Sequence, residues 1–377
     1  MRVAIVTESF LPQVNGVTVS VQRLTENLRA RGHEVLIIAP DGGVSEWAGT
    51  RVVRVPSVPL PGYSGHRVAR PWPWLASTLR AFGPDLVHLA SPAVLGAQAA
   101  VAAERLDVPC VAVYQTDLAS YAALYRAPGT ARAVWRWLRW IHGRAAITLA
   151  PSSQAVTELQ AHGVPRVRRW PRGVDLERFH PLKRDQALHD ELAGGARTVV
   201  GYVGRLAAEK QVHLLAGVDR DPDVQVVVIG DGPFRAALER DLPNARFLGA
   251  QTGARLAALY ASLDVFVHTG PFETFCQAAQ EALASGVPVV APAAGGLLDL
   301  VDDGRNGHLY PPGSGTELAD AVRGLAADPV RRGRLGRAAR ESVLGRSWSA
   351  ITDDYLAHVE DVLPAGVVPA ARRERTA

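Results

Sequence analysis

The sequence is poor in cysteine and contains no long apolar run. Only two cysteines, Cys110 and Cys276, occur among 377 residues, which is too few for a disulfide framework. No stretch of about 18 apolar residues is present, so we expect no membrane-spanning helix. The chain is expected to enter a strand at once, at residues 2–7. This start lacks the longer apolar segment and the cleavage site of a signal peptide. These absences favour a reducing cytoplasm as the compartment.

Acidic residues are missing from two long stretches of the first half. None occurs between Glu46 and Asp85, and none between Asp117 and Glu158. Lys and Arg also outnumber Asp and Glu in the part of the chain up to Asp185. This distribution suits an anionic partner, although an arginine-rich composition that only aids solubility explains it equally well.

Two motifs that would indicate other functions are absent as well. No G-x-G-x-x-G turn follows an expected strand, so a nicotinamide-dependent oxidoreductase is a poor alternative. No recognised nucleic-acid-reading module occurs, so we expect no nucleic acid as a partner.

Short apolar runs alternate with helical stretches in both halves of the chain. This alternation predicts an α/β fold in which parallel sheets carry helices on both faces. The expected strands span residues 2–7, 35–39, 86–89, 111–114, 145–150, 198–203, 224–229, 265–268 and 287–291. We expect two doubly wound, Rossmann-like domains that face a cleft, at residues 1–185 and 196–350. A polar linker would join them, and a last helix is expected at 351–363.

The most informative segment of the chain runs from Gly270 to Gly296. Glu273 precedes an alanine-rich helical run, and Glu281 lies within it, before a turn and a buried strand. A carboxylate accepts two hydroxyl hydrogens, so this pair suits a ligand with two diols, such as the ribose and hexose of a nucleotide sugar. The helix N-terminus between them can receive phosphates. The alternative, a solvated helical face, is disfavoured by the flanking Gly, Pro and apolar strand.

This segment, with Gly295-Gly296 at its end, resembles the retaining nucleotide-sugar glycosyltransferases of family four, which have the GT-B fold. The resemblance implies retaining hexosyl transfer, with mannose from GDP-mannose favoured, to a lipid or glycolipid hydroxyl. Bacterial α-mannosyltransferases that act on glycolipids are the most similar subgroup. The first domain would bind the acceptor and the second the donor, with no cofactor and no essential metal. As in the family, the last helix at 351–363 could cross back to the first domain. A soluble acceptor or a UDP-sugar donor remains an alternative.

The resemblance also implies roles for individual residues. Glu273 would hold the hexose hydroxyls and Glu281 the ribose. Residues 204–210 resemble the phosphate clamp of the family, in which Arg205 and Lys210 would stabilise the leaving diphosphate. The residues expected to bind the donor are Gly16, Arg205, Lys210, Gly232, Thr274, Phe275, Cys276 and Glu281.

The sequence departs from the family pattern at several of these positions. Gln115 stands where His is usual, and because Gln carries no proton at neutral pH it would orient the sugar rather than act as acid or base. Arg172 replaces Asn in the junction Pro-Asn-Gly-Val-Asp, and Cys276 replaces a common Gly. Asp117 either binds a hydroxyl or caps the following segment, and the two roles stay open. Gly16, which opens a helix, would let backbone approach a phosphate closely.

Residues 130–144 predict an amphipathic helix. Val134, Leu138 and Ile141 would form its core face, and the arginines 132, 136 and 139 a second stripe beside two tryptophans. Such a face suits an anionic bilayer, so we expect a cytoplasmic protein with peripheral contact at the inner membrane face. A packed helix with a charged outer stripe is the alternative. The acidic residues 219, 221 and 223 are expected in a solvated loop rather than a metal site.

Overall fold

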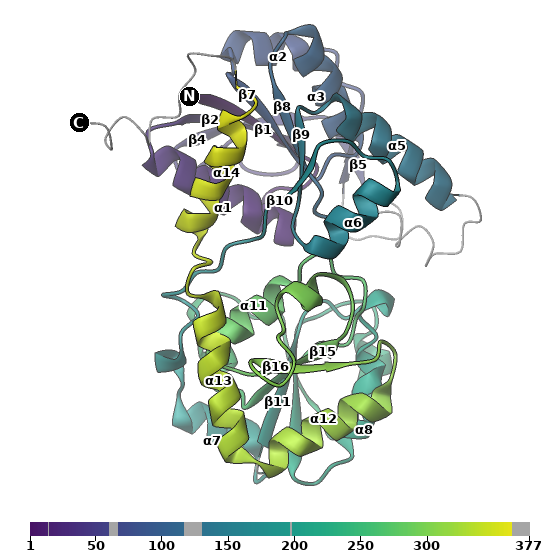
Figure 1. Cartoon of the computed structure of the whole chain (residues 1–377), viewed down its shortest axis with the longest axis vertical. Coiled ribbons are helices and arrows are strands. Elements are labelled where there is room, and N and C mark those ends of the chain that lie inside the picture. Colours follow the sequence, from purple (N-terminus) through teal and green to yellow (C-terminus); the bar gives the residue numbers. More distant parts are fainter. Residues whose placement is uncertain (14, 60–66, 117–129, 197, 364–377) are drawn as a thin grey trace. The chain divides into compact units, whose positions relative to one another are not determined.

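The computed structural model describes residues 1–13, 15–59, 67–116, 130–196 and 198–363. The chain divides into two compact units (Figure 1). Unit 1 holds Met1–Arg172 together with the chain from Trp348 on, and unit 2 holds Gly173–Ser347. The division falls within the turn-rich segment at residues 171–175.

Unit 1 is built on an eight-stranded sheet with the order β10-β9-β8-β7-β1-β2-β4-β3. Neighbouring strands run parallel except for the short β3–β4 pair, and β5 and β6 form a separate antiparallel ladder. The strands are β1 (Arg2–Thr7), β2 (Glu34–Pro40), β3 (Glu46–Trp47), β4 (Thr50–Val55), β5 (Ser57–Pro59), β6 (Arg67–Ala69), β7 (Leu86–Ala90), β8 (Cys110–Val113), β9 (Ile147–Ala150) and β10 (Val167–Arg169).

Helices cover both faces of this sheet because alternate residues of each strand point to opposite sides. Val3 and Ile5 of β1 pack with α1 (Gly16–Ala30) and α14 (Trp348–Glu360), whereas Ala4 and Val6 pack with α2 (Leu75–Phe82) and α3 (Val94–Arg105). Two further helices of this unit are α5 (Thr130–Arg144) and α6 (Ser153–Ala161). The last helix thus packs beside the first (Figure 1).

Unit 2 contains a six-stranded, all-parallel sheet with the order β13-β12-β11-β14-β15-β16. Its strands are β11 (Thr198–Val203), β12 (Val224–Ile229), β13 (Arg246–Gly249), β14 (Val265–Val267), β15 (Val289–Pro292) and β16 (Gly307–Tyr310). Its helices are α7 (Gln186–Ala193), α8 (Ala216–Asp219), α9 (Arg235–Asp241), α10 (Gly253–Ala261), α11 (Gln277–Ala284), α12 (Gly315–Ala327) and α13 (Pro329–Val343). The 3₁₀ helices are η1 (Pro181–Lys183), η2 (Ala208–Lys210), η3 (Val212–Leu215) and η4 (Gly295–Asp299).

The expectation of a linker up to residue 195 is wrong, because this polar stretch carries α7. Asp185 caps the helix by accepting a hydrogen bond from the Leu188 backbone N–H, 3.1 Å away, and Gly194 ends it in a left-handed conformation. Leu188 and Leu192 are buried in the core of unit 2. Within the described ranges, no helix combines the length and apolarity that a membrane crossing requires.

Candidate active site

Most candidate residues of unit 2 follow the two central strands of its sheet. β11 lies between β12 and β14, so the order of winding reverses between β11 and β14. In open parallel sheets, ligands bind outside the carboxyl ends of the strands at such a reversal. The segment after β11 leads to Arg205 and Lys210, and the segment after β14 contains His268 and Glu273.

Glu273 is held by two basic side chains. The Lys210 ammonium donates to Glu273 Oε1 at 2.5 Å, and His268 Nε2 lies 3.1 Å from the same oxygen. Burial raises the pKa of the Glu273 carboxyl, but Lys210 and His268 more than offset this, and the pKa falls below its ordinary value. The carboxyl is therefore ionised throughout the physiological range.

The loop that carries Glu273 is fixed by close backbone packing. The backbone carbonyl oxygen of Glu273 accepts a hydrogen bond from the Gly296 backbone N–H at 2.7 Å. A Cβ at Gly295 would lie 2.3 Å from that oxygen, and a Cβ at Gly296 would lie 2.5 Å from the Phe275 Cα. On the other side, the Thr269 hydroxyl donates to the Lys210 carbonyl oxygen at 2.5 Å. The glycine pair is thus required by the approach of two backbones.

Glu281 has a different environment on α11. Burial raises the pKa of its carboxyl to about 7, against the lowering effects of the Tyr260 hydroxyl, the Arg178 charge and the Gln277 amide. Glu273 and Glu281 therefore differ in charge behaviour near neutral pH, although they belong to one segment. Glu273 stays ionised, whereas Glu281 titrates.

The other expected donor residues of unit 2 lie on the same loops. Arg205 is exposed, and its backbone carbonyl accepts from the buried Tyr202 hydroxyl at 3.1 Å. Gly232 follows β12, and a Cβ there would lie 2.3 Å from the Leu206 carbonyl oxygen, so the loops after β11 and β12 touch.

Residues 274–276 join Glu273 to α11. Thr274 is half-buried, whereas the side chains of Phe275 and Cys276 are buried in the core. Phe275 can therefore face a ligand only through its backbone. Cys276 has a φ of 76°, which L-residues rarely adopt, and it precedes the first helical residue. This conformation explains why a glycine would fit the position well.

Three candidate residues belong to unit 1. Gly16 begins α1, and Gln115 follows β8 and is buried. The Arg172 guanidinium donates to the Gly16 carbonyl oxygen at 2.8 Å and to Gln115 Oε1 at 2.7 Å. Asp117 lies outside the described residues, so its two open roles stay predictions.

Among the described residues, one group of potential metal ligands is close enough to share an ion. It comprises His268, Glu273 and Cys276, whose ligand atoms lie within 4.8 Å of one another. The Lys210 ammonium already bonds the Glu273 oxygen that would bind the ion. The expectation that residue 219 lies in a solvated loop is wrong, because Asp219 is buried and accepts from the Asn244 backbone N–H at 3.1 Å.

Sequence reasoning did not single out His268, Tyr260 or Arg172 as parts of the site. His268 directly follows β14, so its place at a carboxyl strand end was a usable signal. Tyr260 gave no such signal, because it lies on α10 and reaches Glu281 only through the fold.

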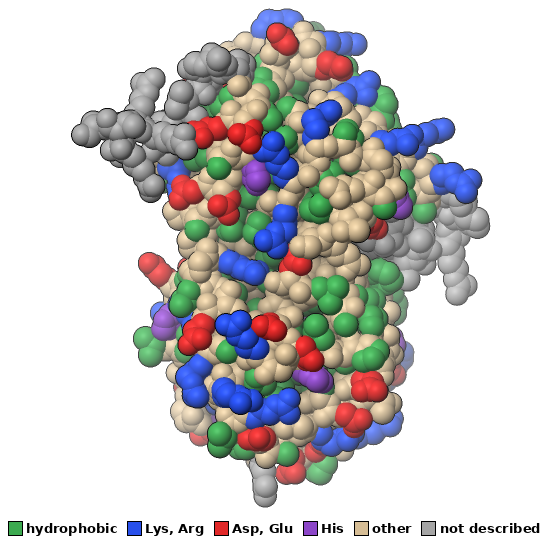
Figure 2. Space-filling model, viewed as in Figure 1, with side chains coloured by type: hydrophobic (Ala, Val, Ile, Leu, Met, Phe, Trp, Pro, Cys, Tyr) green, Lys and Arg blue, Asp and Glu red, His purple; other side chains and the backbone are tan. Residues whose placement is uncertain are grey.

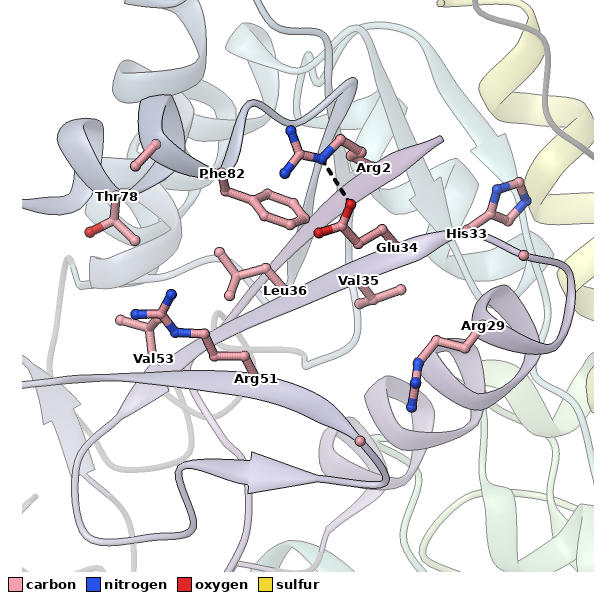
Figure 3. A pocket seen from close by; sticks show the side chains of 13 residues that line it. Arg2, Arg29, His33, Glu34, Val35, Leu36, Arg51, Val53, Thr78 and Phe82 are labelled. Atoms are coloured by element: carbon pink, nitrogen blue, oxygen red, sulfur yellow. Dashed lines mark hydrogen bonds and ion pairs between the residues drawn. The ribbon is translucent and has the colours of Figure 1, made fainter.

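A cavity of about 740 Å³ occurs elsewhere, in unit 1 (Figure 3). It is lined by Arg2 and Glu34, which form a 3.0 Å ion pair, by Arg29, Arg51 and Phe82, and by neighbouring residues. Arg2 and Glu34 begin β1 and β2, so the cavity opens at the amino ends of these strands. It therefore lies at the edge of the sheet opposite to the one where a doubly wound fold binds its ligands.

Two Rossmann-like units with parallel sheets, one carrying a largely buried carboxylate–lysine–histidine cluster at its strand reversal, have the architecture of a GT-B glycosyltransferase. The model of glycosyltransferase family 4 matches residues 14–178, and that of glycosyl transferases group 1 matches residues 184–342. The chain therefore belongs to the glycosyltransferases of family 4.

Curated relatives match almost the whole chain. It is 50% identical over 369 residues to the GDP-mannose-dependent alpha-mannosyltransferase of Mycobacterium tuberculosis, covering 96% of this chain and 97% of that protein. It is 46% identical over 369 residues to the protein of the same name from Corynebacterium glutamicum, covering 96% and 89%. The solved structure of Anabaena Alr3699/HepE with UDP covers 96% of this chain and all of that chain, with a TM-score of 0.79 at 21% identity. That likeness shows the GT-B fold.

Proposed function

We propose that this enzyme transfers mannose from GDP-mannose to a hydroxyl of a lipid or glycolipid, with retention of anomeric configuration. The observation that carries the donor is the 50% identity, over nearly the full chain, to a GDP-mannose-dependent alpha-mannosyltransferase. The lipid acceptor is supported by a 29% identical relative of Mycobacterium tuberculosis, a phosphatidylinositol dimannoside mannosyltransferase, aligned over 374 residues.

The geometry of unit 2 supports a division of labour among its residues. An ionised Glu273 would accept hydrogen bonds from the hexose hydroxyls, because Lys210 and His268 hold it in its charged form. Arg205 and Lys210 would stabilise the negative charge that develops on the leaving diphosphate. Glu281 would accept from the ribose hydroxyls. The departing diphosphate itself would take the proton of the acceptor hydroxyl.

Contact with an anionic membrane through α5 is a further part of the proposal. The outer side of this helix exposes Arg132, Arg136 and Arg139, and beside them Trp137 and Trp140 are 44% and 37% exposed. In the view of Figure 2, Lys and Arg side chains project over the region of α5. Such a face would hold the enzyme at the cytoplasmic surface, where its lipid acceptor would lie.

Transfer assays with the purified chain test the donor and the acceptor. We expect turnover of GDP-mannose, but not of UDP-glucose, with a lipid acceptor in mixed micelles. Exclusive use of UDP-sugars would overturn the donor assignment. Exclusive transfer to soluble sugars would overturn the lipid acceptor.

We also propose that the enzyme needs no metal. In support, the Lys210 ammonium bonds Glu273 Oε1, the oxygen that a metal ion would bind. Full activity is therefore expected after dialysis against excess chelator. Loss of activity that Mg²⁺ or Mn²⁺ specifically restores would contradict this.

A further inference from the structure

Two residues that depart from the family pattern contact each other directly. Gln115 stands in place of a usual His, and Arg172 in place of a usual Asn, yet the Arg172 Nη2 donates to Gln115 Oε1 at 2.7 Å. We propose that the two form one unit, in which Arg172 is a positioning residue that sets the orientation of Gln115 and of the first turn of α1. The inference rests on the proposed function, which it extends to these residues.

Arg172 bridges the start of α1 and the segment after β8, which lie at the same edge of the unit 1 sheet. Its Nη1 donates to the Gly16 carbonyl oxygen at 2.8 Å, where α1 begins, while Nη2 binds Gln115 beyond the carboxyl end of β8. The residue is 7% exposed. Its neighbour Trp170 is fixed by a 2.8 Å hydrogen bond from Nε1 to the Ile351 carbonyl oxygen. The planar guanidinium can hold two acceptors at once, which the amide of an Asn cannot do over this span.

Helix stability does not explain the guanidinium at this point. A cation near a helix N-terminus is electrostatically unfavourable. The end of α1 is already capped by Asn15, whose Oδ1 accepts from the backbone N–H groups of Val17 and Thr18 at 3.0 Å. Arg172 therefore adds positive charge where the helix is already positive, an arrangement that favours a negatively charged ligand.

Arg172 also accounts for the glycine at position 16. A Cβ there would lie 2.9 Å from Arg172 Nη1. Among the described residues outside its own helix and chain neighbours, the only other atom within 4 Å is Arg172 Cζ at 3.9 Å. The φ of Gly16 is not positive, so alanine can adopt its backbone conformation. The space, rather than the backbone, requires glycine. The sequence-based reason, close approach to a phosphate, is not needed to explain it.

The bridge has a chemical consequence for Gln115. Because its carbonyl oxygen accepts from Arg172, the amide is held in one of its two orientations. The guanidinium keeps its charge at any physiological pH. A His at position 115 would add a group that can titrate, with a pKa held below its ordinary value by burial and by the adjacent guanidinium. The Gln115–Arg172 pair therefore carries a fixed charge in the present chain, whereas a Gln115→His variant would titrate below neutrality.

The first test is a double-mutant cycle on Gln115→His, Arg172→Asn and the combined variant. Measured kcat and both Michaelis constants, with thermal unfolding to verify folding, give the coupling. We expect each single variant to lose activity. If the two residues act as a pair, the fraction of activity left in the double variant should be at least about tenfold larger than the product of the fractions left in the two single variants. The Gln115→His variant should also gain a pH dependence below neutrality, because burial and the neighbouring guanidinium lower the pKa of the imidazole. Independent, multiplicative losses would overturn the paired unit.

The second test places Gly16→Ala in the wild type and in the Arg172→Asn variant. If Gly16 makes room for the guanidinium, alanine should lower the thermal midpoint and activity of the wild type and change both little in the Arg172→Asn background. Equal losses of thermal midpoint and activity in both backgrounds would overturn the role of Arg172 as the neighbour that requires Gly16. An Arg172→Lys variant keeps the charge but not the two-pronged guanidinium, so full wild-type activity in that variant would also overturn the positioning role. The thermal readout needs no turnover. A wild type inactive on GDP-mannose would therefore overturn the proposed function alone.

Discussion

At the scale of single residues, the site combines two carboxyls with opposite perturbations. Lys210 and His268 keep Glu273 ionised despite its burial, whereas burial raises the pKa of Glu281 to about 7. A carboxylate accepts hydrogen bonds from hydroxyls, and a protonated carboxyl does so less well. Binding of the donor through Glu281 should therefore depend on pH, and binding through Glu273 should not.

The first prediction concerns the affinity for the nucleotide. Glu281→Ala removes the expected acceptor of the ribose hydroxyls, so GDP binding should weaken by about 2–3 kcal/mol, as for hydrogen bonds to charged groups. Isothermal calorimetry measures the change. Glu341→Ala, which removes an exposed carboxyl of α13, should leave the affinity unchanged. An unaltered affinity in Glu281→Ala would remove this residue from the site.

The second prediction concerns pH. Because only the ionised Glu281 accepts both ribose hydroxyls, GDP affinity should fall as pH decreases through about 7 and level off above it. The phosphates of GDP titrate in the same range, so the control is Glu281→Gln, which keeps their contribution. The wild type should show a steeper pH dependence than this variant, and identical profiles would contradict the prediction.

Sequence reasoning reached the residues that carry local signals. Glu273 and Glu281 were singled out because the first precedes a helical run and the second lies within it, and Lys210 because its segment follows a strand. The contact between Gln115 and Arg172 was not foreseen, because 57 positions separate the two residues. Only the sheet, which brings the end of β8 near the segment that follows β10, makes them neighbours.

At the scale of elements, α5 has two distinct sides. Leu138 and Ile141 are buried, which confirms the predicted core stripe, and Val134 packs beside them. On the outer side the Trp137 and Trp140 rings stack with centroids 5.0 Å apart. A cavity of about 640 Å³ is lined by the basic stripe together with Trp135 and His162.

The third prediction tests this outer side. Replacing Arg132, Arg136 and Arg139 by Gln should weaken binding to anionic liposomes on the order of 100-fold, because each basic residue near such a surface contributes about 1 kcal/mol. Vesicle co-sedimentation measures the effect, which should shrink at high salt.

The matched control removes three arginines from α13, at positions 331, 334 and 337. It changes the net charge by the same amount and should leave liposome binding nearly unchanged. Equal pelleting of the α5 variant and the wild type would show that α5 is not the membrane face. A wild type that ignores anionic vesicles would favour a soluble acceptor.

The elements that sequence reasoning found are the long, apolar ones. β11 and β12 have the bounds predicted from their runs of Val and Ile. β13 was missed because its four residues are only partly buried and begin with Arg246. The helix α7 was taken for a linker because its surface is polar, and only Leu188 and Leu192 reveal a core face. Short elements stabilised by tertiary contacts lack a periodic signal of their own.

At the scale of the molecule, the chain completes unit 1 only after it has built unit 2. The final helix α14 buries Ile351, Tyr355, Leu356 and Val359 in one core with α1 and the sheet of unit 1. The sequence suggested such a return through resemblance alone, since no local pattern states which sheet a terminal helix covers. A consequence is that unit 1 depends on the last described helix.

The fourth prediction measures this dependence at Tyr355. Its ring is fully buried beside Trp170, and its hydroxyl lies 2.9 Å from His88 Nδ1 on the central strand β7. Tyr355→Ala leaves a cavity and an unpaired imidazole, so unit 1 should lose roughly 3–5 kcal/mol of unfolding free energy. Asp354→Ala, one position earlier on the exposed side of α14, should stay within about 0.5 kcal/mol of the wild type.

The composition of the chain provides a readout that separates the two units. All eight tryptophans belong to unit 1, so their fluorescence reports the unfolding of that unit, while circular dichroism reports both. In Tyr355→Ala the fluorescence transition should shift to lower denaturant, whereas calorimetric binding of GDP at low denaturant should persist, because Glu281 and Lys210 lie in unit 2. A fluorescence transition that coincides with the wild type would show that α14 does not stabilise unit 1. A parallel loss of GDP binding would show that the two units unfold together, and the dependence on α14 would then extend to the whole molecule.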